Sequence, residues 1–165
     1  MPDVGMADYQ MSRQHRIIAA CEKWWPLEGP NGKLNYSDCS GFVASVASEL
    51  GVPLSGNANA MYAAIQKEGW SILGHGDSAA HLAAASARCG MFVVGAWKNA
   101  NGANGHVSII VDTNYSSKTP AYQKRAVAYW GHLDSVGQKY ALHSQSWGAN
   151  KRPHVLYSAH QISQT

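Results

Sequence analysis

The sequence has few charged residues and no dense run of basic ones. Asp, Glu, Lys and Arg together make up 14% of its 165 residues, whereas hydrophobic residues make up 45%. A chain of this composition can bury enough apolar surface to fold, which excludes an intrinsically disordered protein. The formal net charge of +3 is mild. Without a Lys/Arg cluster, such a charge does not indicate a nucleic-acid-binding protein.

Long hydrophobic runs are also missing. No apolar stretch approaches the roughly 20 residues that a membrane-spanning helix needs. The first 13 residues lack a basic segment followed by an apolar one, so we expect no secretory signal peptide. The length suits one domain with a substantial core. We therefore expect a single domain over residues 1–165, in which the polar segment 1–12 is flexible.

Cysteine is scarce: the chain contains only Cys21, Cys39 and Cys89. This number does not indicate a disulfide-stabilised scaffold. With Cys39 set aside, Cys21 and Cys89 could pair or stay reduced. We favour two reduced thiols in the core, because each lies in or beside an apolar run. The Cys-x-x-Cys and His-x-x-x-His spacings of zinc sites are absent as well, so we expect no metal and no cofactor.

Hydrophobic periodicity places helices in the first half of the chain and strands in the second. Helices are expected over residues 13–25, 39–50, 57–67 and 74–88. Strands are expected over residues 91–97, 106–112, 125–132, 141–147 and 154–160. Helices followed by an antiparallel sheet of about five strands form an α+β pattern, and this is the fold class that we predict.

The first sign of chemistry is the motif Asp38-Cys39-Ser40-Gly41-Phe42-Val43, where a polar loop turns into an apolar helix. Ser37 or Asp38 can cap this helix, which places Cys39 in its first turn. A helix N-terminus stabilises a thiolate, and its free N–H groups can bind an oxyanion. Cys39 is therefore a candidate nucleophile. A small buried cysteine with a purely structural role would fit the same position.

The second sign is Gly105-His106-Val107-Ser108-Ile109-Ile110, a histidine at the start of a β-branched strand. Histidine can take a proton from a thiol and return it to a leaving amine, so His106 is the candidate base. Cysteine before histidine is the order of papain-like cysteine hydrolases. A third group usually orients such a base. The next strand offers His132, Asp134 or a backbone carbonyl near Trp130.

The long run Cys39–Met61 resembles the first family of type VI secretion amidase effectors. These are small NlpC-type, papain-like cysteine peptidases that one bacterium injects into another. The blocks that carry the resemblance are Asp38–Val43, Ser45–Leu54, Gly56–Met61 and Gly105–Val107, with weaker matches at Val136–Gln138 and Gln145–Trp147. The likeness extends from about Cys21 to Tyr157 and so covers nearly the whole chain.

The resemblance implies a single catalytic domain of papain-like, NlpC-type fold, with Cys39 as nucleophile and His106 as base. It implies hydrolysis of the γ-D-glutamyl–meso-diaminopimelate bond in peptidoglycan stem peptides by a monomer that binds neither nucleic acid nor membrane. The implied partners are the stem peptide, the type VI secretion apparatus and a cognate immunity protein that occludes the cleft. The protein would be made in the cytoplasm of the producing bacterium and would act as a toxin in the periplasm of the recipient cell.

One position departs from the family pattern, because the family carries a cysteine where this chain has Trp130. A role of Trp130 in orienting His106 would therefore come from its backbone carbonyl, and this is the third member that we expect. Three other functions stay open: an amidase of the same type that cuts another wall bond such as muramoyl–L-alanine, a thiol acyltransferase, and a non-catalytic wall-binding module. The presence of both Cys39 and His106 argues against the last.

Overall fold

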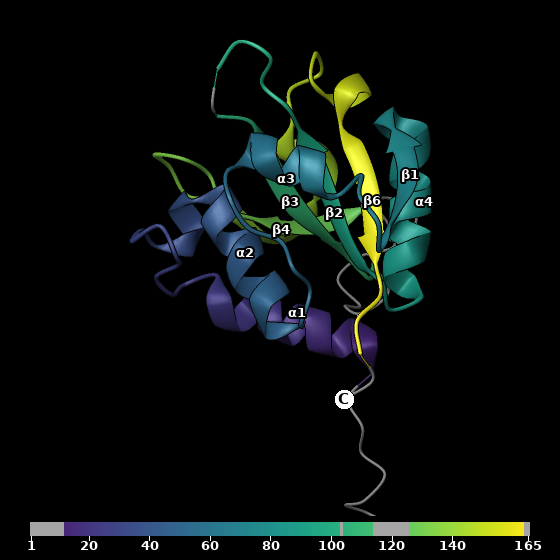
Figure 1. Cartoon of the computed structure of the whole chain (residues 1–165), viewed down its shortest axis with the longest axis horizontal. Coiled ribbons are helices and arrows are strands. Elements are labelled where there is room, and N and C mark those ends of the chain that lie inside the picture. Colours follow the sequence, from purple (N-terminus) through teal and green to yellow (C-terminus); the bar gives the residue numbers. More distant parts are fainter. Residues whose placement is uncertain (1–11, 103, 114–125, 164–165) are drawn as a thin grey trace, which may run out of the picture.

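A computed structural model of the chain describes residues 12–102, 104–113 and 126–163. Within these residues the chain forms four α-helices and a six-stranded antiparallel sheet in the order β1-β6-β2-β3-β4-β5 (Figure 1). The predicted α+β class is confirmed. The segment 1–12, expected to be flexible, lies outside the described residues except for Ser12, which caps the first helix.

The helices are α1 (Arg13–Trp24), α2 (Cys39–Glu49), α3 (Ala58–Ala64) and α4 (Gly76–Arg88). The strands are β1 (Trp70–His75), β2 (Phe92–Trp97), β3 (His106–Val111), β4 (Val127–Trp130), β5 (Gln138–Leu142) and β6 (Leu156–His160). Short 3-10 helices lie at Asn35–Ser37, His143–Ser146 and Arg152–His154. None of the helices in the described ranges is long and apolar enough to cross a membrane.

Side-chain caps fix where the first three helices begin. Ser12, Asp38 and Asn57 each accept a hydrogen bond from the backbone N–H three residues further along the chain. Each bond satisfies an N–H group that has no partner within the helix. The cap by Asp38 matters most for function, because it makes Cys39 the first residue of α2.

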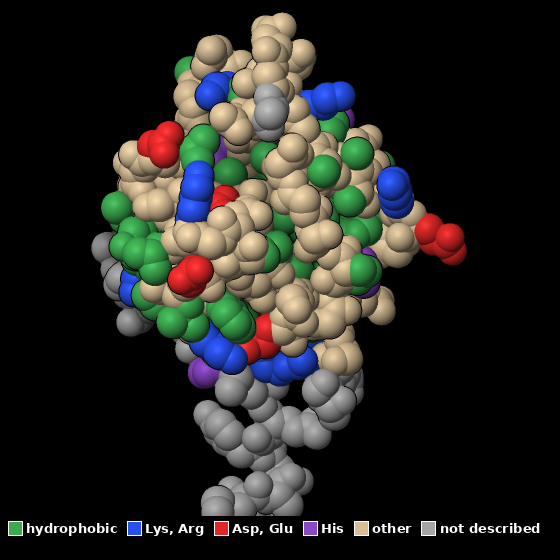
Figure 2. All heavy atoms as spheres, turned by 60° about the vertical axis from the view of Figure 1, so that its left-hand side comes forward, with side chains coloured by type: hydrophobic (Ala, Val, Ile, Leu, Met, Phe, Trp, Pro, Cys, Tyr) green, Lys and Arg blue, Asp and Glu red, His purple; other side chains and the backbone are tan. Residues whose placement is uncertain are grey.

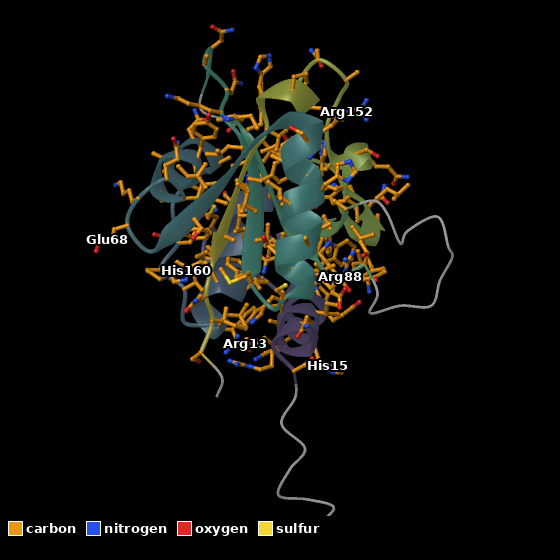
Figure 3. All side chains as sticks on the ribbon, turned by 90° about the vertical axis from the view of Figure 1, so that its right-hand side faces the viewer. Arg13, His15, Glu68, Arg88, Arg152 and His160 are labelled. Atoms are coloured by element: carbon orange, nitrogen blue, oxygen red, sulfur yellow. The ribbon has the colours of Figure 1, made fainter. Side chains whose placement is uncertain are left out.

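The sheet separates two hydrophobic clusters. On one face, α1, α2 and α3 pack against strand residues that include Phe92 and Val107. On the other face, the alanine-rich side of α4, with Ala83 at its centre, packs against Val93 and Ile110. Figure 3 shows α4 lying along this second face. Since successive strand residues point to opposite faces, β2 and β3 contribute to both clusters.

Two strand predictions are corrected by the structure. The segment Trp70–His75 forms edge strand β1, although no strand was predicted there and the fourth helix was expected to begin at residue 74. The sheet therefore has six strands rather than about five. Strand β1 pairs with β6 through a register shift between Ile72 and Gly74, and its burial does not alternate. A strand without alternation has no period-2 signal in its sequence.

The second correction concerns residues 141–147, which were predicted to form a strand. Strand β5 ends at Leu142, and the chain then turns into the 3-10 helix at His143–Ser146, called η3 below. The backbone N–H of His143 still donates to the carbonyl of Ala126, while its imidazole is only 3% exposed. The side chain that enters the interior at this turn is polar, which the hydrophobic pattern did not anticipate.

All three cysteines lie among the described residues and all are unpaired. Cys21 is buried in the core, as predicted. Cys89 is exposed, so the prediction of a core position for it is wrong. Its position explains the difference, because Cys89 follows the last residue of α4 and caps that helix at the surface.

Candidate active site

Cys39 lies where the N-terminus of α2 meets the first residues of β3. Its side chain is 7% exposed, and the backbone N–H groups of Val107, Ser40 and Cys39 itself contact the thiol. Burial raises the pKa of Cys39 above its usual value, and the nearby charge of Asp38 acts in the same direction. The backbone hydrogen bonds lower this pKa, but they do not outweigh burial. The resting side chain is therefore a thiol that already has N–H donors around it.

The turn before α2 is held by buried polar contacts. Asp38, 6% exposed, accepts a hydrogen bond from the Gly41 N–H and another from Asn31 Nδ2 at 2.9 Å. Gly131, just after β4, packs so closely on this turn that a β-carbon there would collide with the carbonyl oxygen of Asn35. The loop after β4 and the start of α2 thus support each other, which fixes the thiol relative to the sheet.

His106 opens β3, and its ring lies among polar and aromatic side chains. Its Nε2 atom forms a hydrogen bond of 2.6 Å with Ser146 Oγ, and Trp147 packs against the ring edge at a centroid distance of 4.8 Å. The ring of His132 lies 6.1 Å away. Burial, followed by the charges of His132 and Lys151, lowers the pKa of His106 to about 3. The imidazole is therefore neutral near pH 7 and free to accept a proton.

The structure brings Cys39 and His106 to the same peptide. The thiol contacts the N–H of Val107, the residue that directly follows His106. No hydrogen bond joins the thiol and the imidazole of these two described residues. Because Ser146 engages Nε2, Nδ1 is the ring nitrogen left for the thiol. Catalytic hydrogen bonds of this kind often shorten only when substrate binds.

This arrangement can perform acyl transfer through a cysteine nucleophile. A neutral thiol and a neutral imidazole can react as a pair when the proton moves to the ring during attack on a carbonyl. The free N–H groups at the start of α2 are placed to stabilise the oxyanion that forms. In the part of the chain that the structure describes, no group of three or more His, Cys, Asp or Glu could hold a metal ion.

Trp130, the expected third member, ends β4. Its carbonyl accepts a hydrogen bond of 3.0 Å from the indole Nε1 of Trp25, and no described contact joins it to the His106 ring. Asp134 lies in the exposed turn beyond β4 with φ of 58° and makes no described contact with this ring either. The hydrogen-bond partner that the structure gives the imidazole is Ser146.

Sequence reasoning missed Ser146 because residues 141–147 were read as a strand, where a serine carries no special signal. The one available hint was the weak family match at Gln145–Trp147. Trp147, the last residue of that match, contacts the His106 ring. Trp97 pairs with His106 across the sheet, and the ammonium of Lys151 lies 4.4 Å from the centroid of its ring.

Comparison with known proteins finds a protein of similar sequence. No protein-family model matches it. It is similar to the peptidoglycan amidase Tse1 of Pseudomonas aeruginosa, with 34% identity over an alignment of 152 residues that covers 89% of this chain and 90% of Tse1. Identity at this level over nearly the full length of both proteins shows that the chain belongs to the family of the peptidoglycan amidase Tse1.

Proposed function

We propose that this protein is a cysteine-dependent peptidoglycan amidase. Its relation to Tse1, by name a peptidoglycan amidase, supports a peptidoglycan-hydrolysing enzyme. The observation that carries the cysteine mechanism is the position of the Cys39 thiol at a helix N-terminus, in contact with the residue that follows His106. Both members of a nucleophile–base pair thus lie at the same end of the sheet.

The reaction proceeds in two halves. The sulfur of Cys39 attacks the scissile carbonyl carbon while the thiol proton passes to His106. The C–N bond then breaks as His106 returns this proton to the leaving amine, and a thioester remains on Cys39. Water gives a proton to His106 and attacks the thioester. The C–S bond then breaks, which releases a carboxylic acid, and His106 returns the proton to the sulfur of Cys39. The N–H groups at the start of α2 hold the oxyanion in both halves.

Within peptidoglycan, the bond we propose is γ-D-glutamyl–meso-diaminopimelate. The resemblance over Cys39–Met61 supports this choice. Stem peptides carry free carboxylates on both sides of that bond, and the ammonium of Lys151 beside His106 would attract such a substrate. Amidases that cut muramoyl–L-alanine, acyltransferases and non-catalytic wall-binding modules are the alternatives that an experiment must separate.

We further propose that the protein acts as an antibacterial toxin in the periplasm of a recipient cell, after delivery by a type VI secretion apparatus. A monomer with a cognate immunity protein over its cleft fits this role. The exposed side chains of Leu34 and Val136 lie on two loops beside Cys39, joined where the Gly137 N–H donates to the Tyr36 carbonyl at 2.8 Å. Figure 2 shows hydrophobic side chains gathered in groups on the side of the molecule that carries α2. Such a surface suits a protein partner.

Digestion of purified sacculi tests the proposed bond. After incubation with the full-length protein, the soluble fragments are identified by mass spectrometry and by labelling of new chain ends. New γ-D-glutamyl carboxylates paired with new diaminopimelate amines are the expected result. New muramic acid carboxylates would instead establish the muramoyl–L-alanine amidase. Transfer to an added amine would establish an acyltransferase, and intact sacculi that retain bound protein would establish a wall-binding module.

A further inference from the structure

The short turn η3 places two side chains directly on the imidazole of His106. Ser146 Oγ lies 2.6 Å from Nε2, and the indole of Trp147, which directly follows η3, packs edge-on at 4.8 Å. Neither Ser146 nor Trp147 belongs to β2 or β4, the two strands that flank β3. The contact joins residues 40 positions apart, so it depends on how η3 is anchored to the sheet.

The anchor of η3 is the buried imidazole of His143. Its Nε2 accepts a hydrogen bond of 2.8 Å from the indole Nε1 of Trp147, while Ser108 Oγ lies 2.7 Å from the same nitrogen. On the other side of the ring, Nδ1 lies 3.1 Å from the hydroxyl of Tyr157. Gly95 leaves the space for this ring, since a β-carbon there would lie 3.2 Å from Nε2.

This network fixes the place of the His143 ring and keeps the ring neutral. The indole N–H of Trp147 lies 2.8 Å from Nε2 and 3.4 Å from Nδ1, and because an indole N–H can only donate, it disfavours a second proton on the ring. The ring therefore contacts β3, β6 and the residue after η3 at once. Such a fully satisfied polar network holds a turn in one conformation, which a loosely packed serine loop would not do.

We propose that Ser146 is the positioning residue that holds His106 with its proton on Nε2, and that the buried His143 network anchors Ser146 for this task. The Nε2–H group of His106 donates to Ser146 Oγ, so Nδ1 presents its lone pair to the thiol. A hydroxyl can donate as well as accept, so it is the lone pair that the thiol needs on Nδ1 that places the ring proton on Nε2. The hydroxyl also adds no negative charge that would favour an imidazolium. The proposal rests on the proposed cysteine mechanism, but the tautomer that it predicts can be measured without a substrate.

Three variants test the role of Ser146 in catalysis. Ser146→Ala removes the hydroxyl, Ser146→Thr retains it, and Ser144→Ala changes an exposed serine of the same turn as the matched control. With a soluble muropeptide, Ser146→Ala should lower kcat roughly 10- to 100-fold with KM within about twofold, because a misplaced base weakens the transition state and not substrate binding. Ser146→Thr should stay within about threefold of the parent, as should Ser144→Ala.

The tautomer provides a second readout that does not need a substrate. Imidazole ¹⁵N shifts of the labelled protein should show His106 protonated on Nε2 in the parent and a mixture of tautomers in Ser146→Ala. If Ser146→Ala keeps both the parental kcat and the parental tautomer, the proposal is wrong and the cysteine mechanism stands. If the parent protein hydrolyses no peptidoglycan, the proposed function is wrong. The ¹⁵N shifts then still decide whether Ser146 fixes the ring.

Discussion

The buried imidazole of His143 makes a direct prediction about acid stability. Burial, with a smaller contribution from the charge of His106, lowers the pKa of His143 from 6.5 to about 3. The donor-only indole of Trp147 against Nε2 gives a geometric reason for the same direction. Because the folded-state pKa lies below the unfolded-state value, the unfolded chain binds a proton between about pH 6.5 and pH 3 that the folded protein does not. Stability should therefore fall as the pH drops through this window.

The size of the effect follows from the shift. A difference of 3.5 units (6.5 minus 3) corresponds to at most ~5 kcal/mol, lost at ~1.4 kcal/mol per pH unit. His143→Gln replaces the ring with an amide that does not titrate. Near pH 7.5 this variant should be less stable by about 1–3 kcal/mol, because hydrogen bonds to buried partners are lost. The deficit should shrink as the pH falls, so the two stability curves should cross roughly between pH 5.5 and pH 4.5.

Urea unfolding followed by tryptophan fluorescence at half-unit steps from pH 4.5 to pH 7.5 measures both curves. The matched control is His81→Gln, which changes an exposed histidine on α4 and should give a curve parallel to that of the parent. A stability deficit of His143→Gln that stays constant over the whole range would contradict the lowered pKa of His143. It would mean that His143 takes up a proton as readily in the folded protein as in the unfolded chain.

Three further predictions concern activity. Since the pKa of His106 is lowered to about 3 and that of Cys39 is raised, kcat/KM for a soluble muropeptide should stay flat from pH 7.5 to pH 5, and an acid limb near pH 6.5 would contradict the neutral pair. Asp134→Asn should cost less than about tenfold in kcat/KM, roughly 1.4 kcal/mol, and a far larger loss would make this carboxylate the orienting group. Expression with a periplasmic signal should lyse a Gram-negative host while cytoplasmic expression is tolerated, as turbidity and viable counts would show. Equal killing from both compartments would indicate a target other than the wall.

The start of α2 could be predicted from the sequence because all its determinants are local. Asp38 caps the helix, an apolar stripe follows, and the result is Cys39 in the first turn. The strand of His106 was equally clear from its β-branched run. The local sequence pattern did not reveal in which direction the pKa of the Cys39 thiol is shifted. A helix N-terminus favours the thiolate, yet burial at the sheet is the larger effect and raises the pKa of Cys39.

The parts that sequence reasoning missed depend on packing across the fold. Strand β1 lies at the edge of the sheet, and its register shift against β6 removes the alternation that marks a half-buried strand. Ser146 reaches His106 only because His143 enters the interior beside Gly95 and turns the chain after β5. A polar residue in the core does not follow the hydrophobic periodicity that marks buried positions. The contact of Ser146 with His106 joins residues 40 positions apart, so no short sequence pattern predicts it.

Digestion of purified sacculi by two cysteine variants decides whether the thiol of Cys39 cuts peptidoglycan. Cys39→Ala and Cys89→Ala, the latter at an exposed thiol away from the site, are compared with the parent at equal concentration after circular dichroism has shown that both variants are folded. Cys89→Ala should release fragments at the parental rate, whereas Cys39→Ala should release none above the background without enzyme. Release by folded Cys39→Ala at close to the parental rate would contradict the cysteine mechanism.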